Sequence, residues 1–106
     1  MDALAALADP VRRELVEVLV HGEMPAGELA GRFPVSRPAI SRHLRVLREA
    51  GLVRVRVEGQ RHLYSLDAAP LAELDAWLAP YRRFWAQRLD AFDTEVRRGR
   101  RGRRPT

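Results

Sequence analysis

Residues 35–66 read VSRPAISRHLRVLREAGLVRVRVEGQRHLYSL, and the spacing of the apolar residues changes within this stretch. Up to Leu47 they recur at steps of three or four, which predicts an amphipathic helix. The valines of residues 53–57 then alternate with arginines, which predicts a strand. A Glu-Gly-Gln turn at 58–60 leads into a second strand at 61–66. The stretch therefore predicts a helix followed directly by a two-stranded antiparallel hairpin.

The helix expected over residues 36–50 has clear end signals and two different sides. Ser36 is a good N-cap, Pro38 is tolerated in the first turn, and Gly51 is typical of a C-terminal cap. Ile40, Leu44 and Leu47 form the apolar side. The opposite side is basic and polar, and consists of Arg37, Ser41, Arg42, Arg45 and Arg48.

Shorter helices are expected before this stretch. Residues 2–8 are rich in Ala and Leu and predict a brief helix. Asp9-Pro10 is a helix start, with Asp as N-cap and Pro at the first position, and this helix should end near residue 21. A further short helix is expected over about 26–32, with Leu29 and Phe33 facing inward.

The last predicted helix, residues 69–96, keeps its apolar spacing across Pro80, so we expect a kink there. It would be about 42 Å long, whereas a compact domain of this size is roughly 34 Å across. Part of its apolar face therefore needs another surface, and we favour a subunit interface over a core helix with a frayed end. An aromatic ligand pocket between subunits is the other alternative. The expected dimerisation residues are Leu4, Leu7, Leu74, Trp77, Leu78, Tyr81, Trp85, Leu89 and Phe92.

Composition limits the possible classes of protein. The 106 residues suit a single domain, placed at residues 1–96, and 46% are hydrophobic, which argues against global disorder. The chain has no cysteine, which excludes disulfides, thiolate metal sites and cysteine nucleophiles. Because it has neither a long apolar run nor a basic start typical of a signal peptide, we expect a cytoplasmic protein without membrane contact.

The charge is unevenly distributed. The net charge is +5, and all 19 basic residues are arginine. Residues 32–64 hold eight arginines and two acidic residues, which indicates a polyanion partner rather than an ordinary solvated face. Residues 97–106 hold six arginines and no acidic residue, and we expect this tail to be disordered. It could bind flanking DNA or only aid solubility.

A basic helix followed by a basic hairpin, inside a mainly α-helical chain, describes a winged helix-turn-helix. One helix fits the major groove of DNA, and arginine can bind guanine through two hydrogen bonds. For His43, a packing role is as plausible as a phosphate contact. Arg12 and Arg13 could meet phosphate or pair with nearby carboxylates. The expected DNA-binding residues are Ser36, Arg37, Ser41, Arg42, His43, Arg45, Arg54, Arg56 and Arg61.

Two other classes of function compete with DNA binding. A winged-helix module that binds protein or RNA is the main alternative, but RNA readers usually present aromatic residues and this basic face has none. An enzyme is disfavoured because neither a Ser–His–Asp set nor a glycine-rich phosphate loop is evident.

The chain resembles the ArsR/SmtB family of bacterial winged-helix repressors over about residues 3–96. The segment ALADPVRREL at 6–15 is similar to the family's opening signature, and residues 35–47 resemble its recognition helix. Residues 50–53 and the hairpin ending in Tyr-Ser-Leu resemble its wing. The resemblance implies a homodimer, formed through the first and last helices, that represses transcription from a palindromic double-stranded DNA operator.

The chain departs from the metal-sensing members that it resembles. Their thiolate motif would fall near residues 27–31, which read GELAG. His21, His43 and His62 are not spaced as a helical metal-ligand pair. We therefore expect no metal or other cofactor, and a member of a cysteine-free branch whose signal is an organic effector, a protein partner or absent.

Overall fold

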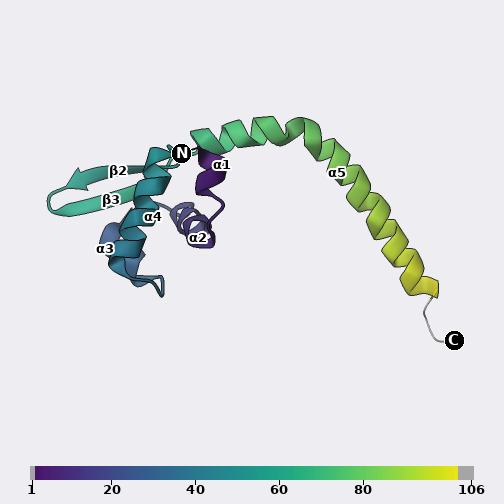
Figure 1. Ribbon diagram of the computed structural model, residues 1–106, viewed down its shortest axis with the longest axis horizontal. Helices are drawn as coiled ribbons and strands as arrows, with labels where there is room; N and C mark the ends of the chain where they lie inside the picture. The colour runs from purple at the N-terminus through teal and green to yellow at the C-terminus, as the bar shows by residue number, and fades with distance from the viewer. Residues whose placement is uncertain (1, 103–106) are drawn as a thin grey trace. The chain divides into compact units, whose positions relative to one another are not determined.

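The computed structural model describes residues 2–102. The chain divides into two compact units after Leu74. Figure 1 shows the short helices and the hairpin of the first unit and the long C-terminal helix. The elements are α1 (Ala3–Ala6), α2 (Pro10–Leu19), β1 (Met24–Pro25), α3 (Ala26–Gly31), α4 (Arg37–Glu49), β2 (Val53–Glu58), β3 (Arg61–Leu66) and α5 (Ala69–Gly102).

The helices of the first unit begin and end where the predicted signals lie. The Asp9 carboxylate accepts a hydrogen bond from the Arg12 backbone N–H at 3.1 Å and caps α2. The Ser36 hydroxyl accepts one from the Ala39 N–H at 3.2 Å and caps α4. Gly51 follows α4 with a φ of 78°, a conformation that suits glycine. The cap predictions are confirmed, and they set where α4 starts.

The sheet has three antiparallel strands in the order β1-β3-β2, so the prediction of a two-stranded hairpin was incomplete. β2 and β3 pair from Val53↔Leu66 to Glu58↔Arg61, and Gly59 in the turn has a φ of 62°. The missed strand β1 pairs Met24 with Tyr64. With two residues, one of them proline, β1 shows no periodicity and forms only because β3 lies beside it.

A single apolar core joins the elements of the first unit. Leu15, Leu29, Ile40, Leu47 and Leu52 are its largest fully buried side chains. The predicted inward residues of α4 are thus buried, and so is Phe33 after α3. Within the described residues no polar or charged side chain is buried. The core fixes α4 on its apolar side and leaves its other side to solvent.

Helix α5 continues through Pro80 and ends at Gly102. The predicted boundary at residue 96 is therefore not the end of the helix. Arg97 pairs with Asp93 one turn earlier, at 3.1 Å, and such a pair favours helix over coil. Residues 97–102, expected to be disordered, are helical, whereas residues 103–106 of the predicted tail lie outside the described residues. No described helix is long and apolar enough to cross a membrane.

Candidate DNA-binding surface

Helix α4 presents an arginine-rich face to solvent. Arg37, Arg42 and Arg45 are exposed, while Ile40 and Leu44 on the other side are buried. Ser41 and Arg48 are also exposed. In the described part of the chain, no acidic side chain lies within ion-pair distance of any of these four arginines. The positive charge of α4 therefore remains available for an external anion.

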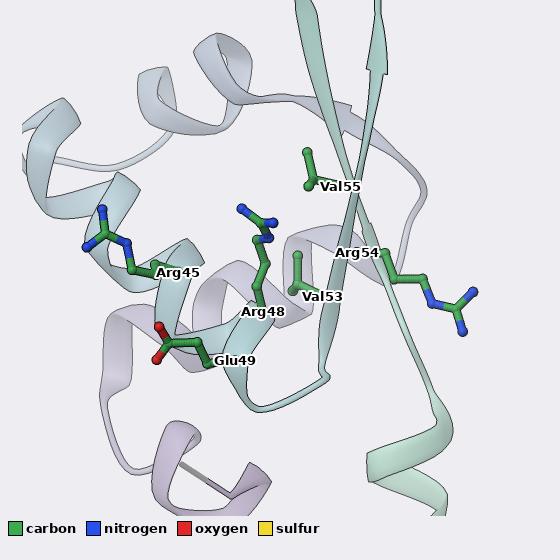
Figure 2. A pocket seen from close by; sticks show the side chains of 6 residues that line it. All are labelled: Arg45, Arg48, Glu49, Val53, Arg54 and Val55. Carbon is green, nitrogen blue, oxygen red and sulfur yellow. The ribbon is translucent and has the colours of Figure 1, made fainter.

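An open groove separates α4 from the first strand of the hairpin. Figure 2 shows Arg45 and Arg48 on the α4 side, with Val53 and Val55 on the strand side. Arg54 points away from α4, because successive side chains of a strand lie on opposite faces. The face of β2 next to α4 is therefore apolar, and its arginines lie on the other face.

Both arginines of β2 are engaged in ion pairs within the chain. The Arg54 Nε donates to an Asp67 oxygen at 2.9 Å. Arg56 donates to both Glu23 oxygens at 2.8 and 2.7 Å, and its third nitrogen lies 2.9 Å from Glu58. The hairpin thus carries much less free positive charge than its sequence suggests.

The pKa values of the acidic partners reflect this pairing. The hydrogen bond from Arg56 lowers the pKa of Glu23, and the same bond raises that of Arg56. The pKa of Asp67 is lowered first by the hydrogen bond from the Ala69 N–H and then by Arg54. Sequence reasoning missed both carboxylates, because Glu23 is 33 residues from Arg56 and Asp67 is 13 residues from Arg54.

Three other predicted DNA-binding residues, Ser36, His43 and Arg61, differ in their surroundings. The Ser36 hydroxyl is occupied as the cap of α4. The His43 side chain is only 21% exposed, and its Nδ1 lies 3.3 Å from an Arg12 nitrogen and 3.9 Å from Asp9. The ring lies toward α2, the geometry that the packing alternative for His43 predicts. Arg61 is exposed beside the turn of the hairpin.

The two arginines at the start of α2 bind backbone carbonyl groups rather than carboxylates of α2. The Arg12 Nε donates to the Ala6 carbonyl at 2.6 Å. Arg13 donates to the Leu7 carbonyl at 3.0 Å. Both acceptors belong to the end of α1, where helical carbonyl groups lack partners within the helix.

The expected dimerisation residues differ in exposure. In the first unit, Leu4 is 62% exposed, Leu7 packs partly against the core, and Leu74 is half-buried. Along α5, Leu78 is half-buried, and the exposed apolar side chains are Trp77, Tyr81, Phe84, Trp85, Leu89 and Phe92. The Trp77 and Tyr81 rings are 5.3 Å apart, and the Arg88 guanidinium lies 4.3 Å from the Phe84 ring centre. So large an exposed apolar surface is typical of an interaction site.

A helix pair with an arginine-rich second helix, followed by a β-hairpin, is the architecture of winged helix-turn-helix DNA-binding proteins. Comparison with known proteins agrees with this class. The family model described as a helix-turn-helix domain matches residues 7–56.

Named relatives define the family. The HTH-type transcriptional regulator Rv2034 of Mycobacterium tuberculosis is 49% identical over 90 residues, which cover 85% of this chain and 81% of that protein. The transcriptional repressor SdpR of Bacillus subtilis is 37% identical over 73 residues, covering 69% and 81%. The crystal structure of an ArsR family transcriptional regulator superposes with a TM-score of 0.71 at 30% identity, covering 78% of this chain and 91% of that one. The chain belongs to the ArsR family of DNA-binding transcriptional regulators, a non-enzymatic class.

Proposed function

We propose that this protein is a homodimeric repressor that reads a palindromic operator with α4. The observation that carries the proposal is the exposed arginine face of α4, with which no acidic side chain pairs in the described part of the chain. The similarity of the chain to a protein named as a transcriptional repressor supports repression rather than activation. Because the chain lacks cysteine, we expect no metal signal, and the alternatives are an organic molecule, a protein partner or no inducer.

In this proposal α4 enters the major groove and its first turns meet the base edges. Arg37, Ser41 and Arg42 lie in those turns, and arginine can bind guanine O6 and N7 together. Arg45 and Arg48 lie further along the helix, beside the groove next to β2. The DNA backbone is the anion assigned to this groove, since phosphates bind arginine and the sugars can rest on the half-buried Val55, while Glu49 also lines the groove.

The hairpin makes a smaller contribution than its arginine content suggests. Arg61, next to the turn, is exposed and is the wing residue that we assign to the DNA backbone. Arg54 and Arg56 remain in their ion pairs and hold the hairpin to neighbouring parts of the first unit. Their role is to position the wing.

The dimer is proposed to form through the exposed apolar faces of α1 and α5. Leu4 and the aromatic residues of α5 are too exposed to be explained by packing within one protomer. A two-fold axis would place two copies of α4 about 34 Å apart, in successive turns of the major groove. The two-fold symmetry is why the operator should be an inverted repeat, and the spacing sets the distance between its half-sites.

The test is selection of bound duplexes from a random library, followed by affinity measurements over a range of salt concentrations. Arg42→Ala should relax the preference at one base position of each half-site. Arg45→Ala should weaken binding to all sequences and reduce the salt slope by about 0.9 per phosphate lost. Arg54→Ala, the matched control, should leave the slope nearly unchanged because its partner is Asp67.

The opposite result, in which Arg54→Ala alters the slope and Arg45→Ala does not, would contradict the assignment of the DNA-binding face. If the unsubstituted protein binds random and selected duplexes equally, the proposal of sequence-specific repression is wrong.

A further inference from the structure

Arg12 joins three helices through three separate groups. Its backbone N–H, in the first turn of α2, donates to the capping carboxylate of Asp9 at 3.1 Å. Its Nε donates to the Ala6 carbonyl of α1 at 2.6 Å. Its Nη1 lies 3.3 Å from the Nδ1 of His43 on α4. A single side chain thus connects the end of α1 with the middle of the helix proposed to read DNA.

The contact with His43 depends on the chemistry of both groups. A guanidinium can only donate, so the imidazole Nδ1 must accept and its proton must reside on Nε2. The Asp9 carboxylate lies 3.9 Å from the same Nδ1, and His43 is largely covered. At 3.9 Å the carboxylate is not a hydrogen-bond partner of this Nδ1, so the Arg12 hydrogen bond is what holds the ring, and rotation of α4 about its axis would break it.

The place of Arg12 in α2 indicates a role beyond the stability of that helix. A cation in the first turn of a helix faces the positive end of the helix dipole, which is unfavourable. The neighbouring Arg13 also donates to a carbonyl of α1, at 3.0 Å, but in the described part of the chain it makes no hydrogen bond with α4. Arg13 is more exposed than Arg12, but it also binds the end of α1 and it lacks the hydrogen bond to α4.

We propose that Arg12 is a positioning residue for DNA recognition, because through His43 it fixes the rotation of α4 relative to α1. Neither residue touches DNA in this arrangement; they aim Arg37, Ser41 and Arg42 at the base edges. The inference rests on the proposed function of α4. The Arg12–His43 contact also couples the recognition of bases by α4 to the position of α1. Displacement of α1 would therefore reduce the selectivity for the operator without removing any DNA contact.

The experiment measures the ratio of dissociation constants for a scrambled duplex and for the selected operator, at one salt concentration. The loss of one hydrogen bond predicts that Arg12→Ala and His43→Leu each lower this ratio about 3- to 10-fold. The double variant should lower it no further, because both substitutions remove the same link. Arg13→Ala, the matched control, should leave the ratio unchanged.

Two further readouts separate positioning from other roles. His43→Asn provides a carbonyl oxygen near the position of Nδ1 and should restore the ratio, which a purely space-filling histidine would not predict. The affinity for scrambled DNA and the salt slope should remain as in the unsubstituted protein, whereas loss of a phosphate contact would change both. Thermal unfolding of each variant verifies that α4 is still folded, and Arg12→Lys serves as a milder variant if Arg12→Ala unfolds.

The outcomes are distinct. If the unsubstituted protein is selective and His43→Leu is equally selective, the positioning role is wrong while the proposed function stands. If the two single substitutions have additive effects, Arg12 and His43 act separately and the link is refuted. If the unsubstituted protein shows no selectivity, both the proposed function and this inference are overturned.

Discussion

Replacement of Trp85 by alanine tests the proposed dimer at the centre of its apolar face. Trp85 follows Leu74, Leu78 and Tyr81 at steps of three or four along α5, and Leu89 follows one turn later. Its side chain is 39% exposed in the single chain. A partner helix packed on this stripe would cover that exposed part.

The expected size of the effect follows from the exposed area. An aromatic side chain offers about 200 Å², so roughly 80 Å² of Trp85 is available for burial in each protomer. At about 25 cal/mol per Å² this is worth about 2 kcal/mol, or about 4 kcal/mol for the two copies in a symmetric dimer. Because about 1.4 kcal/mol corresponds to a tenfold change, complete burial predicts a dimer Kd raised roughly 1000-fold, and half burial about 30-fold.

Sedimentation velocity over a dilution series measures this Kd directly. Gln87→Ala is the control, since Gln87 lies about 160° around the helix from Trp85 and is also exposed. Circular dichroism shows whether α5 remains helical in both variants. The reasoning is refuted if Trp85→Ala dimerises as tightly as Gln87→Ala, or if the unsubstituted protein is a monomer at micromolar concentration.

Three further predictions concern the fold that supports the DNA-binding face. Ser36→Ala removes the cap of α4 and should lower the free energy of unfolding by about 1 kcal/mol in urea denaturation, whereas Ser36→Asp should retain it. The hydrogen bond from Arg56 lowers the pKa of Glu23 below 4.5. The contribution of this ion pair to the free energy of unfolding is therefore fully present above pH 4.5, and it is lost as the pH falls through the lowered pKa. Glu23→Gln should therefore lower the melting temperature near neutral pH and have little effect in acid, and an equal effect at both would contradict the pairing. Leu47→Ala, at a site with 0% exposure, should cost about 2–5 kcal/mol, read from the urea midpoint, and a cost below 1 kcal/mol would show that the core collapses around the gap.

Local signals in the sequence were sufficient to predict most of the first unit. Asp9 and Ser36 each cap the helix that follows, and their side chains bond to backbone groups three residues away. The apolar period of α4 predicted its buried side because packing of one helix face depends on spacing alone. Interactions of this range are contained in a short window of sequence.

Interactions between distant segments could not be predicted in this way. Strand β1 exists because Met24 meets Tyr64, and its own two residues carry no strand signal. The alternation in β2 correctly placed Arg54 and Arg56 on one face. It did not reveal that this face points away from α4, because that depends on how the sheet packs against the helices.

The position of the ion pairs changes which part of the basic segment can recognise DNA. In sequence, residues 32–64 look uniformly cationic. In the structure, Arg54 and Arg56 are paired with carboxylates, whereas no acidic side chain among residues 2–102 pairs with the exposed arginines of α4. Both pairs are exposed, so a phosphate contact at Arg54 or Arg56 is weakened only by the small free energy of an exposed ion pair. Among the described residues of this segment, most arginines without an acidic partner lie on α4, and the orientation of that helix decides which bases they meet. This is why a contact such as that between Arg12 and His43, remote from the DNA-binding face, can influence selectivity.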